Sequence, residues 1–188
     1  MLNIDLKING KIATDKIDFL VMQNLEAQKV VNLESAKLLA SYIPDLLGAY
    51  FYASNGKVSS YQILNYFLDK FNEPAVVHIT TWGFTELALR QMANRKKAGQ
   101  IKELYFVFSD QVQVNKANEF QLATSIATAY KKHPCHAKIY LIKTATYQVS
   151  IITSGNLNRN NKLEAGTISF SSDIYNGYAN YLNKLING

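Results

Sequence analysis

The stretch "HAKIYLIKTATYQVSIITSGNLNRN", residues 136–160, decides how this chain is interpreted. It begins with a His and a Lys two residues apart, in an apolar run that is typical of a strand. A second apolar run follows after a short gap and ends in a Ser, a Gly and the first of several Asn. Hydroxyl, carboxamide and ammonium groups all bind phosphate. The question is why so many of them gather at the ends of two neighbouring strands.

The first strand of the stretch carries its polar groups on one face. Within residues 136–142, strand alternation places His136, Lys138 and Tyr140 on the same side. A Lys is costly to bury without an anionic partner, and a bound phosphate would be such a partner. A His in the same place can attack phosphorus or protonate a leaving oxygen. The pair therefore indicates a phosphate site.

The second strand ends at residue 153 and is followed directly by Ser154 and Asn156. Their hydroxyl and carboxamide groups, together with backbone amides, can donate to phosphate oxygens. Glu164 follows after a short Asn-rich loop. A carboxylate in reach of His136 would fix the imidazole tautomer and stabilise the imidazolium. An ion pair with a basic residue of the loop is the alternative role for Glu164.

The order of these residues resembles the signature of the phospholipase D superfamily. That family has His-x-Lys on one strand and Ser-x-Asn after the next, with a Glu or Gln further on. The matching positions here are His136, Lys138, Ser154, Asn156 and Glu164. The run "SGNLNRNNKLEAG" looks most like the small nuclease-like and phage-type members that have one motif per chain. The resemblance covers about residues 130–172, and the order of strands and helices extends it from about residue 48 to the end.

One position departs from the family pattern. Most members carry an Asp five residues after the Lys, where this chain has Lys143. In the family this Asp is mostly a structural residue behind the catalytic groups. The departure therefore bears on activity more than on the fold.

The resemblance implies a metal-independent phosphodiesterase without a cofactor. In the family, two motifs face each other across a twofold axis: one His forms a phosphohistidine, while the other protonates the leaving oxygen and then activates water. The implied catalytic residues are His136, Lys138, Asn156 and Glu164, with Ser154 joining Lys138 and Asn156 in binding phosphate. Because the chain has one motif, a C2 homodimer would bring His136 of each copy to the shared axis. No His, Cys, Asp or Glu cluster of the sequence has metal-ligand spacing, so no metal is expected.

Composition agrees with a polyanionic partner. The chain has 188 residues, a net charge of +6 and a pI near 9.2, which favours nucleic acid, DNA or RNA, over an anionic membrane. Cys135 is the single cysteine, so an internal disulfide is excluded and a reducing cytoplasm is expected. The N-terminus lacks the apolar core of a signal peptide, and no segment approaches the roughly 18–20 apolar residues of a membrane span. We therefore expect a soluble, cytoplasmic protein with no membrane partner.

Periodicity predicts two parts and an α/β fold. Residues 1–45 are expected to form an N-terminal arm that serves oligomerisation, with a hairpin at its Asn-Gly turn, and residues 46–188 a phospholipase D-like domain. The predicted strands are 48–54, 75–82, 103–109, 136–142, 147–153 and 165–171, and the predicted helices are 32–43, 60–71, 84–99, 118–132 and 173–186. This alternation favours a mixed, largely parallel sheet flanked by helices. Ligands in such folds lie beyond the carboxyl ends of the strands.

Two further features of the sequence have competing interpretations. Trp82 ends a predicted strand, where a core or rim role is favoured over stacking on a base. The basic run Arg95, Lys96 and Lys97 closes a helix; a solvated helix end is favoured over contact with a nucleic-acid backbone.

The functional hypothesis is a nuclease that acts on DNA or RNA through a phosphohistidine. The alternative is a catalytically weak or inactive nucleic-acid-binding module of the same fold. A phospholipid-processing enzyme is a weaker third hypothesis, since no interfacial apolar patch is recognisable in the sequence.

Overall fold

The computed structural model describes residues 31–32, 39–43, 45–158 and 161–188. Most of the predicted arm, including its hairpin, lies outside the described residues. Within the arm, strand β1 (Val31–Asn32) pairs with the sheet, and helix α1 (Leu39–Tyr42) is a single turn. Leu39 and Ile43 are buried in the main core, so the described part of the arm packs on the domain.

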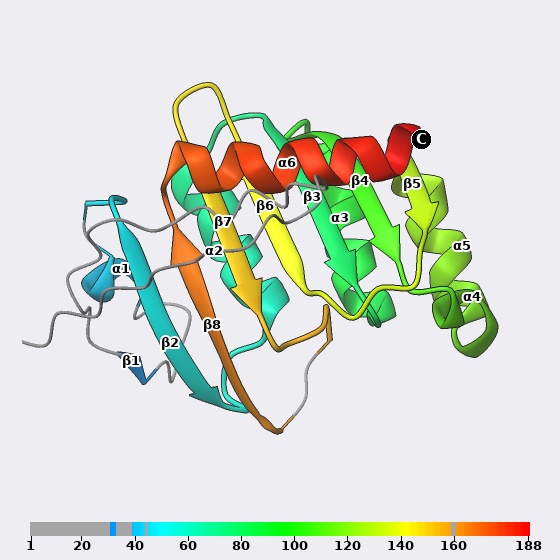
Figure 1. Cartoon of the computed structure of the whole chain (residues 1–188), viewed down its shortest axis with the longest axis horizontal. Helices are drawn as coiled ribbons and strands as arrows, with labels where there is room; N and C mark the ends of the chain where they lie inside the picture. The colour runs from blue at the N-terminus through cyan, green and yellow to red at the C-terminus, as the bar shows by residue number, and fades with distance from the viewer. Residues whose placement is uncertain (1–30, 33–38, 44, 159–160) are drawn as a thin grey trace, which may run out of the picture.

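One eight-stranded sheet, in the order β1-β2-β8-β7-β6-β3-β4-β5, forms the centre of the described chain (Figure 1). Beyond β1, the strands are β2 (Ala49–Asn55), β3 (Ala75–Thr81), β4 (Ile101–Phe108), β5 (Ala129–Lys132), β6 (Ile139–Lys143), β7 (Gln148–Thr153) and β8 (Leu163–Ser169). The sheet is mixed, as predicted. The expectation of a largely parallel sheet is wrong, because among the described strands β2/β8, β3/β6, β6/β7 and β7/β8 pair antiparallel and three other pairs are parallel.

The length of the connections explains this correction. Strands β6, β7 and β8 follow one another in the chain and in the sheet, and only residues 144–147 separate β6 from β7. A parallel pair needs a crossover of about a dozen residues or more, whereas antiparallel strands can be joined by a hairpin. The stretch that carries the predicted motif is therefore a meander, and the parallel pairing is confined to the outer strands.

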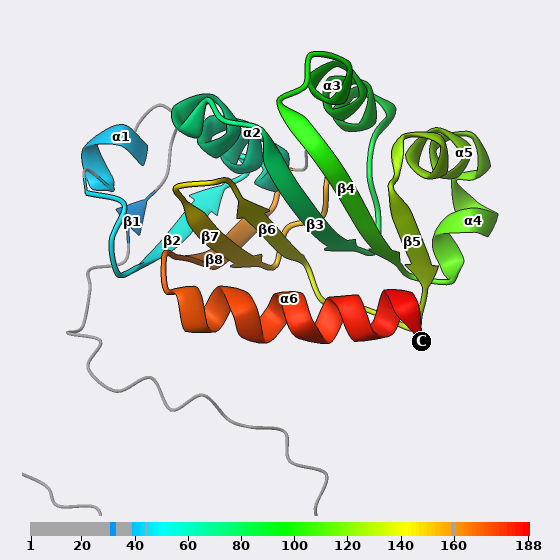
Figure 2. The same ribbon diagram turned by 90° about the horizontal axis from the view of Figure 1, so that it is seen from above.

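Helices cover both faces of the sheet (Figure 2). Those on one face are α2 (Ser60–Phe71), α3 (Glu86–Lys97), α4 (Gln111–Asn115) and α5 (Ala117–Ile126), and α6 (Ser172–Asn187) crosses the other face. The predicted helix 118–132 ends early, because residues 129–132 pair with β4 as an edge strand. Within the described ranges, no helix has the length and apolar character to cross a membrane.

Strand alternation divides the core into two layers. Tyr140 belongs to the larger layer under α2, α3 and α5, which also holds Phe67 and Phe108. Leu141, the next residue of β6, lies in the smaller layer under α6 with Tyr175. Tyr140 and Leu141 therefore lie on opposite faces of the sheet, as strand alternation requires. Burying a side chain of this size stabilises the fold by roughly 1.5–3 kcal/mol.

Several strand ends meet at one edge of the sheet, which we call the carboxyl edge. The end of β3 pairs with the start of β6 at Thr80 and Ile139, and Ile139 pairs with Ile152 near the end of β7. Thr153 in turn pairs with Gly166 of β8. The carboxyl ends of β3 and β7 therefore lie beside the amino ends of β6 and β8, and the predicted motif residues flank these four ends.

Candidate active site

His136 and Lys138 lie in the segment that leads into β6. The predicted strand 136–142 begins only at Ile139, so the expectation that both side chains project from a strand face is corrected. The Thr80 hydroxyl donates to the Ala137 carbonyl and accepts from the Ile139 amide, both at 2.9 Å. This side chain takes the place of a ladder hydrogen bond and fixes the segment at the carboxyl edge. His136 is exposed there, whereas Lys138 is buried.

The two side chains are in contact. The Lys138 Nζ atom lies 3.1 Å from His136 Nδ1 and 3.3 Å from Nε2, and it donates to the His136 carbonyl at 2.6 Å. Burial lowers the pKa of Lys138 below its usual value, while the nearby Cys135 and Glu164 act in the opposite direction. A bound anion would offset the lost hydration of this ammonium group. The pair thus has the properties that phosphate binding requires.

Ser154 and Glu164 form a second pair, which the sequence did not predict as a contact. The Ser154 hydroxyl donates to the Glu164 carboxylate and accepts from the Ala165 amide. The Ser154 amide donates to the Ala165 carbonyl at 2.9 Å. Ser154 is therefore tied to the start of β8, and the negative charge beside it acts on Lys138.

Asn156 links the end of β7 to the end of β3. Its Oδ1 atom accepts from the Trp82 amide at 3.2 Å and from the Thr81 hydroxyl at 3.4 Å. The following residue, Leu157, donates to the Gly83 carbonyl at 3.0 Å. With its oxygen held in this way, the Asn156 side chain presents its amide hydrogens as donors.

Gly155 lies between Ser154 and Asn156 in the chain and anchors their loop to the core. Its carbonyl accepts from the Ser60 hydroxyl and the Tyr140 hydroxyl, both at 2.9 Å. Tyr140 is fully buried, and burial raises the pKa of its phenol. A Cβ atom at Gly155 would lie 2.5 Å from the Ser60 hydroxyl oxygen, so Ser60 would have to shift and its hydrogen bond to the Gly155 carbonyl would be disturbed. A Tyr inside an apolar strand is the one signal in the sequence that could have indicated this anchor.

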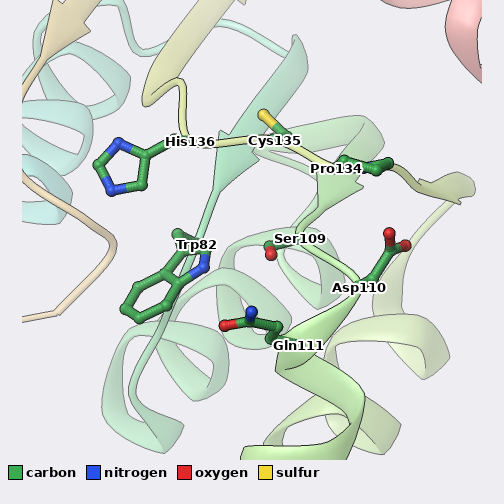
Figure 3. Close-up of a pocket in the computed structure, with 7 residues that line it drawn as sticks. All are labelled: Trp82, Ser109, Asp110, Gln111, Pro134, Cys135 and His136. Carbon is green, nitrogen blue, oxygen red and sulfur yellow. The ribbon is translucent and has the colours of Figure 1, made fainter.

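Trp82 stands at the rim of the site. Its ring centroid is 6.1 Å from that of His136, with the ring planes at 50°, and the side chain is 43% exposed. A shallow hollow of about 380 Å³ extends from these two rings toward Asp110 (Figure 3). A second hollow of about 120 Å³ reaches from Trp82 to Asn156 and Lys116. The rim role favoured for Trp82 agrees with this position.

Lys143, where most family members have Asp, lies far from these groups. It is the last residue of β6, is exposed, and pairs with Val76 and Gln148 at the opposite edge of the sheet. A five-residue strand spans roughly 15 Å. The departure from the family pattern is therefore separated from His136 by more than the length of β6.

The structure gathers all five predicted residues at the carboxyl edge. His136 contacts Lys138, Ser154 contacts Glu164, and Asn156 is bonded to the backbone of Trp82, whose ring faces His136. Within the ranges that the structure describes, no group of three or more His, Cys, Asp or Glu side chains is placed to hold a metal ion.

Comparison with known proteins supports the fold alone. No family model matches the chain. No curated protein sequence matches it significantly. Among solved structures, polyphosphate kinase from Porphyromonas gingivalis is similar with a TM-score of 0.61 and 16% sequence identity, over 82% of this chain and 29% of that one. The kinase is a member of the phospholipase D superfamily, so the likeness agrees with a phospholipase D-like fold; this chain spans less than a third of its length.

Proposed function

We propose that this protein is a metal-independent phosphodiesterase, a nuclease that cleaves DNA or RNA at an active site shared by a homodimer. The observation that carries the proposal is the contact between His136 and a buried Lys138 at the carboxyl edge. The net charge of +6 supports a polyanionic substrate. A fold neighbour named for polyphosphate is in keeping with a phosphate-directed site.

The proposed reaction has two displacements. A ring nitrogen of His136 attacks phosphorus, a P–N bond forms, and the P–O bond to the leaving group breaks. The partner's His136 donates a proton to the leaving oxygen. That same imidazole then takes a proton from water, whose oxygen attacks phosphorus and breaks the P–N bond. His136 is regenerated and the phosphate monoester leaves.

The other residues bind the phosphoryl oxygens or position the groups that do. Lys138, with its hydration reduced by burial, offsets the charge that develops on the non-bridging oxygens. Asn156 supplies amide donors because its oxygen is held by the Trp82 amide. Ser154 would exchange its hydrogen bond to Glu164 for one to phosphate, which leaves that carboxylate to act on His136 and Lys138.

A second copy of the chain is required by this scheme. Each chain carries one His-x-Lys motif, so each supplies half of the two-histidine site. Residues 1–45 are our candidate for part of the dimer interface.

The test is cleavage of labelled single- and double-stranded DNA and RNA in excess EDTA. We expect the wild type to cut at least one of these substrates and His136→Ala to lose at least about 1,000-fold in rate. His133→Ala is the matched control, since this neighbouring His contributes a backbone hydrogen bond to Phe108. Full activity in His136→Ala, or activity that disappears with EDTA, would refute the proposed mechanism.

One observation favours a non-catalytic alternative, a module that binds nucleic acid without cutting it. The Lys138 ammonium lies within 3.3 Å of both ring nitrogens of His136, and an attacking imidazole needs one of them free. This alternative predicts that binding survives in His136→Ala and that the wild type forms no product. A parallel assay with phospholipid vesicles tests the remaining hypothesis, phospholipid cleavage.

A further inference from the structure

The larger hollow beside His136 has no part in the phosphate chemistry described above. It lies between the residue after β3, the start of α4 and the segment before β6, with Trp82 and His136 on one side and Asp110 on the other (Figure 3). Its volume of about 380 Å³ falls in the range of roughly 300–1,000 Å³ that is typical of small-molecule sites. Because His136 forms part of its wall, whatever occupies it is adjacent to the atom that receives the phosphoryl group.

The charges around the hollow disfavour a second phosphate as its occupant. Of the described residues that line it, none is Lys or Arg, and Asp110 contributes a carboxylate. An anion there would be repelled by Asp110 without a cation to hold it. The hollow is therefore suited to a neutral group that offers hydrogen-bond donors.

Trp82 provides a fixed aromatic surface on one wall. Its backbone is held by the hydrogen bond to Asn156, and its ring remains 43% exposed although it is large and mostly apolar. The ring lies 6.1 Å from the His136 ring, which is close enough for one nucleotide to touch both. Exposed aromatic rings in phosphate-binding grooves are the surfaces on which bases stack.

The other walls of the hollow carry polar groups. Ser109 is buried and brings a hydroxyl, Asp110 a carboxylate and Gln111 a carboxamide (Figure 3). Hydroxyl and carboxamide groups accept or donate, whereas an ionised carboxylate only accepts. Together they can hydrogen-bond the edge of a base. In a duplex that edge is paired and the base faces are stacked, so only an unpaired base can enter.

We propose that this hollow binds the unpaired base of the nucleotide next to the scissile phosphate, stacked on Trp82 with its edge toward Ser109, Asp110 and Gln111. The proposal rests on the proposed function and narrows its substrate to single-stranded nucleic acid. Asp110 favours bases with an exocyclic amino group, which are adenine, cytosine and guanine, over thymine or uracil.

The chain offers a direct reporter for this subsite, because Trp82 is its single tryptophan. We would titrate the full chain with five-nucleotide oligocytidine and oligothymidine, a short duplex, and inorganic polyphosphate. The His136→Ala variant prevents the proposed cleavage, and EDTA suppresses any metal-dependent nuclease in the sample. A stacked base quenches tryptophan fluorescence. The proposal expects quenching by the single strands, strongest with oligocytidine, and none by the duplex or by polyphosphate.

Binding of labelled oligonucleotides by fluorescence anisotropy supplies the mutational arm. Trp82→Ala should weaken single-strand binding about 5- to 150-fold, with Trp82→Phe closer to the parent. Tyr181→Ala is the matched control, because Tyr181 is a 58% exposed aromatic on α6. Asp110→Asn should abolish the preference for oligocytidine over oligothymidine.

Each contrary outcome has a distinct meaning. Equal quenching by duplex, binding without quenching, an unchanged Trp82→Ala, or no binding at all overturns the base subsite. An unchanged preference in Asp110→Asn overturns the assignment of the base edge. If bases quench the fluorescence but the wild type cleaves nothing, the phosphodiesterase is refuted and the base subsite stands. If Trp82→Ala cleaves at the full rate, the base subsite is refuted and the phosphodiesterase stands.

Discussion

The carbonyl of Gly155 shows how single atoms hold the candidate site in place. It accepts from both Ser60 and Tyr140, and Ser154 and Asn156 flank it in the chain. Tyr140→Phe should lower the free energy of unfolding by about 1 kcal/mol, and so should Ser60→Ala, because the other donor still satisfies the oxygen. The double variant leaves the carbonyl with neither donor. We expect it to lose more than the sum of the two, as measured by urea denaturation in a double-mutant cycle. Strict additivity would mean that the carbonyl does not depend on these donors.

His78 links the fold to pH. It is buried with its ring stacked on Tyr105 at 4.7 Å, and its Nε2 lies 2.9 Å from Asn183 Oδ1 on α6. Burial lowers the pKa of His78, while the hydrogen bond with Asn183 and the negative charge of Glu103 act in the opposite direction. The unfolded chain therefore binds this proton at a higher pH than the folded chain. The stability that the neutral ring contributes is present above about pH 6.5 and is lost as pH falls through the lowered pKa.

The expected result is a melting temperature that decreases from pH 7 to pH 5, with a flatter profile in His78→Gln. Two carboxyl groups with lowered pKa values, those of Asp69 and Glu73, contribute little between pH 7 and pH 5, because most of their effect lies near and below their ordinary values of 3.8 and 4.5. Parallel profiles for the wild type and the variant would assign the pH dependence to other groups.

Residue patterns predicted which side chains gather at the site better than they predicted their contacts. His136, Lys138 and Asn156 could be recognised because they flank two predicted strands that are close in the sequence. Neighbouring strands of a sheet place the residues at their ends near one another. The anchor between Ser60 and Gly155 joins positions 95 residues apart, and a local pattern carries no signal for such a contact. Trp82 was correctly placed at a strand end, but its distance from His136 depends on how β3 and β6 pair.

At the scale of elements, Gly166 sets how closely β7 and β8 approach. A Cβ atom there would lie 2.5 Å from the Ile152 carbonyl and 2.8 Å from the Tyr52 ring. Gly166→Ala should therefore destabilise the chain by about 1–3 kcal/mol, since backbone and a buried ring would both have to shift. Gly83→Ala is the control, because nothing lies within 4 Å of the position that a Cβ atom would take there. Urea midpoints of the two variants decide this, and equal midpoints would contradict the steric argument.

Elements were predicted well where local signals and packing agree. Helix α2 has the predicted bounds, helped by a capping box between Ser59 and Gln62. The helix predicted over 118–132 was wrong at its end, because Thr128 bonds to Leu104 and the next residues pair with β4. That pairing is a tertiary preference, which overrides helix propensity.

At the scale of the molecule, the basic groups near the site differ from the basic run noted in the sequence. Arg95 is paired with Asp69, and Lys96 donates to the Ile126 carbonyl. Lys131 and Lys132 end β5 at the carboxyl edge, where Lys132 pairs with Phe108 of β4 and its Nζ donates to Gln113 on the exposed surface. Under the proposed function, these two lysines are our candidates for contact with the nucleic-acid backbone.

The double variant Lys131→Ala/Lys132→Ala should bind single-stranded DNA more weakly. The slope of log affinity against log salt should become shallower by about 1–2, which is the loss of one or two phosphate contacts. Lys96→Ala/Lys97→Ala is the matched control and should keep the wild-type slope. The measurement is anisotropy over a salt series, and the inference fails if the control pair changes the slope and the β5 pair does not.

A site shared by two subunits predicts how the cleavage rate depends on the proportion of wild-type and variant subunits. If each site needs His136 from both copies, a dimer with one His136→Ala subunit is inactive at its only site. Mixing equal amounts of wild type and His136→Ala, with time for subunit exchange, should then leave about one quarter of the wild-type rate, because that is the share of all-wild-type dimers. Independent sites in each chain would leave about one half. Mixing wild type with His133→Ala should leave the rate unchanged. This control shows whether the mixing step alone affects the rate. A linear decrease in activity with the fraction of variant would show that one chain holds a complete site, and the two-histidine mechanism would have to be abandoned.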